Sequence, residues 1–278
     1  MIHFVGAGPG AADLITIRGA ELLGAADVII YAGSLVNPAL LKCARPDCEL
    51  YNSAEMTLEQ ILKIMEASER GGKVVVRLHS GDPSLYGAIG EQTKALDEIG
   101  IAWDVTPGVS SFCGAAAALG VEYTLPGVSQ SLILTRLPGR TPVPDAERLA
   151  GLAAHGASMA LFLSAGALDA AQRELLDSGG YASDAPAAIV YKATWDDEKI
   201  IRCTVGTLAE LGRRAGIRKT ALILVGDFLK ASGERSKLYD PSFETEYRKG
   251  RGDPSPCPPS LSGTGERENK ADNWKGTS

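Results

Sequence analysis

The sequence predicts an α/β protein made of two α/β domains, and three observations support this prediction. Short apolar runs rich in Val and Ile alternate with segments of helical period. Apolar residues make up 45% of the 278 residues, enough to bury a core in one large domain or in two smaller ones. A connection marked by Pro and Gly, at 125–130, divides the runs into two series. The expected domains are therefore 1–124 and 125–232.

The first series begins with a strand and alternates strands with helices. Strands are expected at 2–5, 27–31, 73–78 and 102–106, and helices at 16–24, 57–70, 85–99 and 109–119. The helix at 57–70 has the clearest pattern, an apolar stripe formed by Leu58, Ile61, Leu62 and Met65. The run Val74–Val76 is β-branched throughout, which favours a strand. Short strands that are apolar along their length predict a mostly parallel sheet, buried on both faces.

The second series has the same character and ends in a polar tail. Its strands are expected at 132–136, 159–163, 187–192, 199–204 and 221–225, and its helices near 145–154, 168–178 and 205–215. The last segment, 250–278, holds 13 Gly, Pro or Ser among 29 residues and almost no aliphatic residues. Such a segment buries too little surface to offset its chain entropy, so we expect a disordered tail.

Composition excludes several classes of protein. The formal net charge is −6, whereas a nucleic-acid binder normally shows a basic balance or stripe. The charge-free stretch 149–168 is broken at His155–Gly156, and the first residues lack a basic segment, so we expect neither a membrane span nor a signal peptide. Five cysteines without a C-x-x-C pair and three scattered histidines give little support for a metal site. These features are typical of a cytoplasmic protein with reduced thiols and no bound metal.

A glycine-rich turn, Gly6–Ala11, directly follows the first expected strand and satisfies G-x-G-x-x-G/A. Taken literally, this pattern is a dinucleotide fingerprint. Two features oppose that interpretation: Pro9 removes a backbone donor, and no acidic residue follows the strand at 27–31 to bind a ribose. Three interpretations stay open, namely a turn that lets a ligand approach the backbone, a purely structural turn, and a nicotinamide or flavin site.

Two further strand-to-helix connections carry polar and small residues. The segment Arg77–Gly87 contains Asp82, and the segment Thr106–Ser111 repeats the arrangement. Both would lie at the carboxyl ends of strands, where open α/β sheets bind ligands. Asp82 could accept hydrogen bonds from a ribose or an ammonium group, or it could cap the next helix with Pro83 near the first position. The repetition of the arrangement favours a ligand site.

These segments resemble the signatures of the tetrapyrrole methyltransferases. Three of them occur in that family's order: Gly8–Gly10 with Asp13–Thr16, then Gly81–Pro83, then Pro107–Ser110. Other segments resemble the branch of the family that methylates C11 of precorrin-4 on the cobalamin route; they are 31–36, 125–130, 135–136 with 139–142, and 190–195. The resemblance covers about residues 2–230.

The resemblance implies a fold, a cofactor and an assembly. It implies two α/β domains with S-adenosylmethionine (SAM) in a cleft between them, and a homodimer. Carried over position by position, the cofactor contacts are Pro9, Ser80, Gly81, Asp82, Leu85, Ser110, Ser111, Leu163 and Ala193. Relatives that methylate uroporphyrinogen have an aspartate, assigned as a proton acceptor, where this chain has Ala32. Uroporphyrinogen is therefore a less favoured substrate than precorrin-4 or its cobalt complex.

The implied substrate is an anionic tetrapyrrole, so a chain with net charge −6 must supply local cations. The candidates are Arg136 and Arg140 first, then Arg77 and Lys192, each with solvated surface charge as the alternative. Methyl transfer from a sulfonium is an in-line displacement that requires positioning, so we assign no catalytic residue. Alternative functions are methylation of another ring carbon, such as C17 or C20, and nicotinamide-dependent oxidoreduction; a non-catalytic SAM-binding module is a third.

Overall fold

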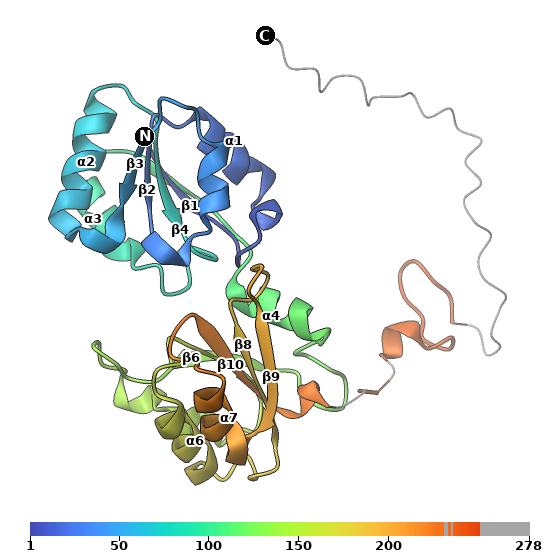
Figure 1. The fold of residues 1–278 in the computed structure, drawn as a ribbon. Coiled ribbons are helices and arrows are strands. Elements are labelled where there is room, and N and C mark those ends of the chain that lie inside the picture. The colour runs from blue at the N-terminus through green and yellow to red at the C-terminus, as the bar shows by residue number, and fades with distance from the viewer. Residues whose placement is uncertain (231–232, 235, 251–278) are drawn as a thin grey trace. The chain divides into compact units, whose positions relative to one another are not determined.

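The structure is a computed structural model that describes residues 1–230, 233–234 and 236–250. The chain divides into two compact units, residues 1–234 and residues 235–278. The first unit contains two five-stranded sheets, each with helices on its faces (Figure 1). This arrangement confirms the α/β class. The domain boundary expected after Thr124 stays a prediction.

The first sheet is entirely parallel. Its strands are β1 (Ile2–Gly6), β2 (Val28–Tyr31), β3 (Glu49–Asn52), β4 (Val75–His79) and β5 (Trp103–Thr106), in the order β3-β2-β4-β1-β5. The sequence did not predict β3, because this edge strand is short and carries no fully buried residue that would give it an apolar signal. The parallel order places the carboxyl ends of β4, β1 and β5 next to one another.

Helices cover both faces of the first sheet. They are α1 (Ile17–Ala25), α2 (Leu58–Arg70) and α3 (Ile89–Glu98). Helices α2 and α3 pack on one face around Phe4, Ile61 and Leu96, whereas Leu23 of α1 packs on the other face. Helix α2 begins with a complete capping box, in which Thr57 and Gln60 each satisfy the other's backbone N–H.

Helix α3 starts four residues later than the sequence predicts. The helix expected at 85–99 begins at Ile89, because Tyr86 and Ala88 both adopt left-handed backbone conformations, with φ of 56° and 49°. Gly87 lies between them, and an ideal Cβ at this position would lie only 2.2 Å from the backbone oxygen of Pro83. The segment 82–88 is therefore a tight loop and not the first turn of the helix.

The second sheet is mixed. Its strands are β6 (Leu132–Arg136), β7 (Ser158–Phe162), β8 (Pro186–Tyr191), β9 (Lys199–Thr204) and β10 (Ala221–Val225), in the order β6-β7-β10-β8-β9. Only β6 and β7 pair in parallel; the three other pairings are antiparallel. The carboxyl ends of β6, β7 and β8 and the start of β10 consequently share one edge.

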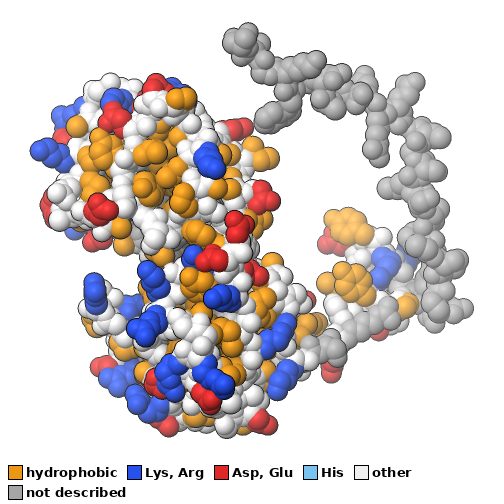
Figure 2. Space-filling model, in the orientation of Figure 1, with side chains coloured by type: hydrophobic (Ala, Val, Ile, Leu, Met, Phe, Trp, Pro, Cys, Tyr) orange, Lys and Arg blue, Asp and Glu red, His pale blue; other side chains and the backbone are white. Residues whose placement is uncertain are grey.

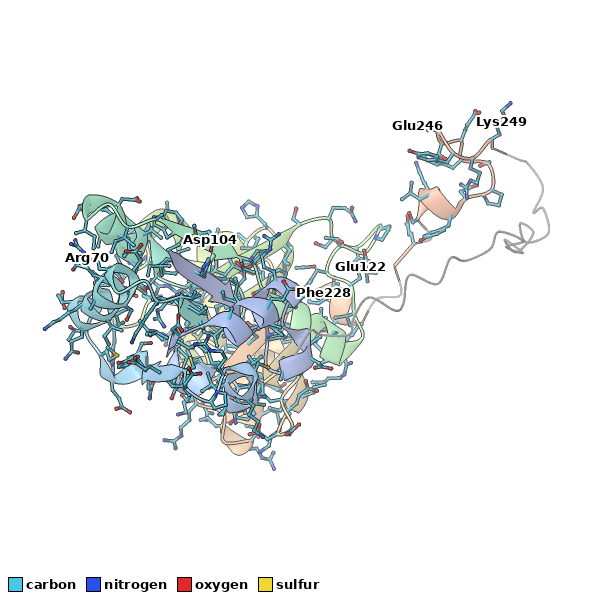
Figure 3. The ribbon with its side chains drawn as sticks, turned by 90° about the horizontal axis from the view of Figure 1, so that it is seen from above. Arg70, Asp104, Glu122, Phe228, Glu246 and Lys249 are labelled. Carbon is cyan, nitrogen blue, oxygen red and sulfur yellow. The ribbon has the colours of Figure 1, made fainter. Side chains whose placement is uncertain are left out.

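The second sheet is also covered on both faces. Its helices are α4 (Ser111–Leu119), α5 (Leu149–Ala153), α6 (Leu168–Asp177) and α7 (Leu208–Arg214). Helices α5, α6 and α7 pack on one face around Met159 and Ile189, whereas α4 packs on the other face with Ala160. The side chain of Phe228, labelled in Figure 3, is 1% exposed and completes that second core. Helix α4 thus follows the first sheet in sequence but packs on the second.

Short 3-10 helices punctuate the connections. In the first unit they lie at Ala12–Leu14, Gly33–Leu35, Pro38–Cys43, Ser53–Glu55, Asp145–Glu147, Val205–Thr207 and Asp227–Leu229. In the described part of the chain, no helix has the length and apolar content that crossing a membrane requires. Within the same residues, no group of three or more His, Cys, Asp or Glu side chains is placed to hold a metal ion.

The described part of the second unit, residues 236–250, is organised around one arginine. The guanidinium of Arg248 donates to the carbonyl oxygens of Leu238, Asp240 and Phe243, at 2.8 to 3.1 Å. This segment includes a 3-10 helix at Lys237–Tyr239 and the residues Glu246 and Lys249 that Figure 3 labels. Apart from Gly250, the disordered tail expected over 250–278 lies outside the described residues.

Candidate functional site

Three loops meet at the carboxyl edge of the first sheet. They follow the adjacent strands β4, β1 and β5. Gly8 and Gly81 form an isolated antiparallel bridge, in which the Gly81 N–H donates to the Gly8 oxygen at 2.8 Å and the Gly8 N–H to the Gly81 oxygen at 3.2 Å. The first glycine turn is therefore tied directly to the loop that carries Asp82.

The same loops touch through backbone atoms at two other glycines. An ideal Cβ on Gly6 would lie 2.6 Å from the Cα of Gly108, and one on Gly108 would lie 2.2 Å from the backbone oxygen of Gly81. No side chain fits at either position, because the opposing atoms belong to backbone. Part of the glycine pattern therefore serves loop-to-loop packing, as the structural interpretation of the turn predicts.

Asp82 joins two of the loops through its carboxylate. One oxygen accepts the Ser84 N–H at 2.8 Å and the Ser84 hydroxyl, and the other accepts the Gly108 N–H at 2.9 Å. Burial alone would raise the pKa of Asp82, but the hydrogen bonds from Ser84 and Gly108 outweigh it and lower the pKa. The next helix begins at Ile89 with Ala88 as its N-cap, so the capping role considered for Asp82 is wrong.

Residues that follow β8 in the second sheet contact the first glycine turn. The hydroxyl oxygen of Thr194 accepts the Ala11 N–H at 2.9 Å, and the indole Nε1 of Trp195 donates to the Pro9 oxygen at 3.2 Å. An ideal Cβ on Gly10 would lie 2.1 Å from the Trp195 ring. The turn's N–H groups at Gly8 and Ala11 are thus already bonded, and Pro9 has none. These contacts disfavour a pyrophosphate site and with it the nicotinamide interpretation.

Backbone strain is concentrated at the same two sheet edges. Within the described residues, the non-glycine positions with positive φ are Tyr86, Ala88, Leu163, Lys192, Thr194 and Thr220. All of them lie in the loop after β4 or at the shared edge of β7, β8 and β10. The ring of Tyr86 also lies 5.1 Å, centroid to centroid, from that of Phe162 at the end of β7. Strained conformations of this kind cluster at ligand sites, which supports this region as the candidate site.

The structure brings most of the expected cofactor positions into this region. Pro9, Ser80, Gly81, Asp82 and Leu85 lie in the first two loops, and the ideal Cβ of Gly81 would be 3.6 Å from the Cα of Ser110. Ser110 is buried and precedes Ser111, the first residue of α4, but its hydroxyl makes no capping hydrogen bond.

The two cofactor positions expected from the second series differ in exposure. The side chain of Leu163 is 71% exposed directly after β7, at a left-handed position. Ala193 is buried, and it directly precedes Thr194, the residue that contacts the first glycine turn. An exposed leucine held in a strained conformation offers an apolar surface to a ligand.

The candidate substrate contacts divide into two groups. Arg136 lies at the end of β6, where its guanidinium donates to carbonyl oxygens of Leu137, Thr141 and Pro142 and so shapes the loop that carries Arg140. Arg140 is exposed and makes no ion pair with another described residue. The ammonium of Lys192 is 2.7 Å from the Asp197 carboxylate and 5.0 Å from the Trp195 ring centroid. Arg136 ends β6, Arg140 lies in the loop that follows, and Lys192 directly follows β8, so all three lie at one edge of the second sheet.

Arg77 occupies a different environment. It lies in the interior of the first sheet, 6% exposed, where its guanidinium donates to Gln92 Oε1 at 3.1 Å and to the Ile30 oxygen at 3.1 Å. Burial lowers its pKa to about 10. This interior position removes Arg77 from the set of candidate carboxylate contacts.

Sequence reasoning missed the contacts made by Tyr86, Thr194 and Trp195. The bonds from the latter two join residues 183 and 186 positions apart in the chain. No local pattern indicates such a pairing. For Thr194 and Trp195, the available signal was their presence within 190–195, one of the segments that resemble the family.

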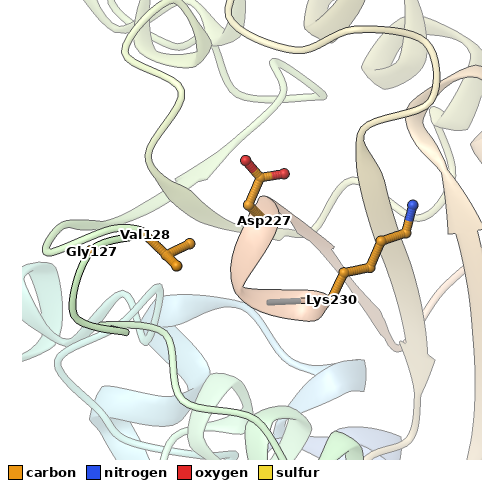
Figure 4. A pocket seen from close by; sticks show the side chains of 4 residues that line it. All are labelled: Gly127, Val128, Asp227 and Lys230. Carbon is orange, nitrogen blue, oxygen red and sulfur yellow. The ribbon is translucent and has the colours of Figure 1, made fainter. Parts of the chain in front are cut away.

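Two surface cavities are lined by other residues. One, of about 370 Å³, is lined by Gly127, Val128, Asp227 and Lys230 (Figure 4). It lies beyond the carboxyl end of β10, at the edge opposite Leu163, because β10 runs antiparallel to β7. The other, of about 390 Å³, lies between α6 and α7 and includes the ion pair of Asp169 with Arg213. Neither cavity contains an expected site residue.

Charge is distributed unevenly between the two sheets. Residues 1–124 contain eight Lys or Arg against fifteen Asp or Glu, whereas residues 125–234 contain twelve of each. Figure 2 shows Lys and Arg side chains spread over the surface formed by the second sheet and its helices. An anionic ligand is therefore accommodated more readily by the second sheet.

The fold and this loop arrangement define an α/β protein that takes a small ligand where the strands end. Residues 1–209 match the tetrapyrrole (corrin/porphyrin) methylases, and the chain belongs to this family. It is 53% identical to the cobalt-precorrin-4 C(11)-methyltransferase of Methanocaldococcus jannaschii over 249 aligned residues. The alignment covers 89% of this chain and 96% of that protein. The family resemblance and the methyltransferase class expected from the sequence are thereby confirmed.

Solved structures of other proteins support the same family assignment. The X-ray structure of a cobalt precorrin-4 methyltransferase is similar, with a TM-score of 0.80 at 46% identity over 83% of this chain and 96% of that one. The uroporphyrin-III C-methyltransferase from Thermus thermophilus, complexed with S-adenosyl homocysteine, gives a TM-score of 0.69 at 25% identity over 84% and 95% of the two chains.

We expect the substitution Gly108→Ala to destabilise the chain. Its methyl group would clash with the Gly81 backbone oxygen, and overpacking of this kind costs about 1–3 kcal/mol of unfolding free energy. The matched control is Gly90→Ala in α3, where nothing lies within 4 Å of the added Cβ and a small gain in stability is expected. Urea denaturation measures both; wild-type stability of the Gly108 variant would contradict the packing argument.

We expect Asp82 to contribute to stability in a pH-dependent manner. Its pKa is lower in the folded chain than its ordinary value of 3.8, so its contribution is present above that value and is lost as the pH falls through the folded pKa. Denaturation of wild type and Asp82→Asn between neutral and acid pH should show a difference that shrinks as the carboxylate is protonated.

The control for this measurement is Asp184→Asn. Asp184 is exposed, and its carboxylate makes no hydrogen bond to another described residue. Its variant should follow the wild-type pH dependence. If the Asp82 variant does so too, the hydrogen bonds of the Asp82 carboxylate contribute nothing to stability.

Proposed function

We propose that this chain is a SAM-dependent C-methyltransferase that methylates C11 of precorrin-4 or cobalt-precorrin-4 in cobalamin biosynthesis. The observation that carries the proposal is the 53% identity to an enzyme named for this reaction, over 96% of that enzyme's length. A homodimer, which the family resemblance implies, is part of the proposal, and so is a cytoplasmic location, which the cysteine usage favours.

The loops at the edge of the first sheet fit SAM. Backbone contacts between glycines hold three loops together, and the buried hydroxyl of Ser110 is left without a capping hydrogen bond. The N–H groups at the start of α4 can donate hydrogen bonds to a carboxylate. We propose that Pro9, Ser80, Gly81, Asp82, Leu85, Ser110 and Ser111 hold the cofactor from the first sheet, and Leu163 and Ala193 from the second.

SAM supplies a methyl group on a sulfonium, with a neutral thioether as the leaving group. The protein's task is to hold the carbon nucleophile about 3–3.5 Å from that methyl group, in line, with water excluded. The exposed side chain of Leu163 and the paired rings of Tyr86 and Phe162 provide apolar surface for this purpose. Ala32 offers no carboxylate where uroporphyrinogen methylases have one, so positioning carries the reaction.

The substrate's carboxylates require cations on the second sheet. Arg140 has no acidic partner among the described residues, and Arg136 fixes the backbone of its loop. Lys192 lies at the end of β8, next to the segment that contacts the glycine turn. We propose these three residues as carboxylate contacts, because a guanidinium or ammonium at a sheet edge can bind such groups without prior burial.

Incubation with SAM and precorrin-4, or its cobalt complex, should add one methyl mass, and NMR of the product should place it on C11. Methylation at C17 or C20 instead would overturn the substrate assignment while leaving the class intact. SAM should raise the melting temperature in a thermal-shift assay, whereas NAD should not, because only a ligand of the folded state stabilises it. Stabilisation by NAD alone would contradict the proposed cofactor.

Arg140→Gln should raise KM for the tetrapyrrole about 3- to 10-fold, which is the effect expected from losing one hydrogen bond of an exposed charged group. The Kd for SAM should not change, because Arg140 is assigned to the substrate alone. Arg214→Gln, which removes a cation paired with Glu210 on α7, is the matched control. An unchanged KM for the Arg140 variant would remove this residue from the proposed contacts.

A further inference from the structure

Within the described part of the chain, Arg77 is a buried cation without an anionic partner. Among the described residues, its hydrogen-bond acceptors are a side-chain amide, Gln92 Oε1, and a backbone carbonyl, that of Ile30. His79, two residues further along β4, is 4% exposed, and its Nε2 atom has no hydrogen-bond partner among the residues that the structure describes. Burial and the charge of Arg77 lower the pKa of His79 to about 3, so this ring is neutral and gives Arg77 no compensation.

Burying a cation without an anionic partner costs folding free energy, because the guanidinium loses its hydration. An apolar side chain of similar size would fill the interior of the sheet without the cost of desolvating a guanidinium. Stability therefore does not explain why Arg77 occupies this position. The hydrogen bonds of Arg77 suggest a reason for its position, because they connect it through Gln92 to the loop after β4.

Gln92 connects Arg77 to that loop. The Gln92 side chain, 4% exposed, accepts from Arg77 Nε with its oxygen and donates from Nε2 to the Ala88 oxygen at 3.0 Å. The bond from Arg77 determines which end of the amide is the acceptor, and so directs the NH₂ group toward Ala88. Ala88 is the left-handed N-cap residue of α3 and the last residue of the loop.

We infer that Arg77 is a positioning residue, which acts through Gln92 to hold the loop 82–88 in the strained form that binds SAM. The loop contains Asp82 and Leu85, both proposed cofactor contacts, and Tyr86, whose ring meets Phe162 of the second sheet. Its two left-handed residues, Tyr86 and Ala88, are costly conformations that persist only where neighbouring groups fix them. The inference rests on the proposed function for its ligand.

The decisive variant is Gln92→Glu. A glutamate retains the acceptor for Arg77, so the buried charge stays bonded and the fold is preserved. Its ionised carboxylate cannot donate to the Ala88 oxygen, so the connection to the loop alone is lost. We expect SAM binding, measured by calorimetry, to weaken about 3- to 10-fold, with KM for SAM rising and kcat retained. Hydrogen exchange in the ligand-free chain should become faster within residues 82–90 only.

Two further variants make the test specific. Thr93→Val changes the neighbouring residue of α3, whose hydroxyl donates only to Gly90, and should leave both measurements at wild-type values. Arg77→Met combined with Gln92→Leu, which leaves no buried charge at either position, should weaken SAM binding no more than Arg77→Met alone, because both residues act in one chain of bonds. If Arg77→Met does not fold, the comparison of Gln92→Glu with Thr93→Val still decides whether the hydrogen bond from Gln92 to Ala88 holds the loop.

The two possible failures are distinguishable. Wild-type exchange over 82–90 in Gln92→Glu would overturn the positioning role, whatever the ligand. A wild-type chain that binds no SAM would overturn the proposed cofactor, and the exchange measurement would then test the positioning role by itself. Faster exchange throughout the first sheet would show that Gln92 is merely structural, which also contradicts the inference.

Discussion

The contact among three backbone segments at the edge of the first sheet determines how the site is built. Gly6, Gly81 and Gly108 approach so closely that none of the loops after β1, β4 and β5 can move without displacing another. The reciprocal hydrogen bonds between the backbones of Gly8 and Gly81, and the carboxylate of Asp82, then fix the loops relative to one another. A ligand at this edge meets a surface that is organised before it binds, which reduces the ordering cost of binding.

The second sheet contributes residues that are held in costly conformations. Leu163, Lys192, Thr194 and Thr220 all have left-handed backbones at one edge of that sheet. Two hydrogen bonds offset the strain at Thr194. Its hydroxyl accepts the Ala11 N–H, and its own N–H donates to a Glu198 carboxylate oxygen at 2.6 Å. The strain at this edge is thus balanced partly by contacts with the glycine turn, so the two halves of the site depend on each other.

Sequence patterns predicted the fold well where burial is continuous. Strands such as β6 and β10 have the expected bounds, because their apolar or β-branched residues leave no alternative. The edge strand β3 escaped prediction because half-exposed residues carry no clear period. The start of α3 was placed too early because nothing in the letters Tyr86–Ala88 indicates a left-handed backbone. Such conformations are fixed by side-chain contacts, here a local one from Gln92 to Ala88 and a long-range one between Tyr86 and Phe162.

The candidate site was predictable in its loops but not in its charges. Spacing and composition located the turns at Gly6–Gly10, Gly81–Asp82 and Pro107–Ser110, since small residues at strand ends are a local property. Arg77 was a candidate carboxylate contact in the sequence, ranked after Arg136, yet Arg77 lies inside a sheet and Arg136 at a sheet edge. Whether Arg77 is buried depends on which face of β4 is covered by α3. The sequence of one strand that is buried on both faces does not show which face that is.

The unequal charge of the two sheets explains why the position of each cation, buried or at a sheet edge, matters for ligand binding. Residues 1–124 have almost twice as many acidic as basic residues, and their one buried guanidinium is used on an internal amide. Under the proposed function, a polycarboxylate substrate would be repelled by the first sheet and attracted by the cations of the second, while the sulfonium of SAM tolerates an acidic surrounding. Cofactor and substrate would then be sorted by electrostatics before any specific contact forms, with the strained loop 82–88 lying where the two meet.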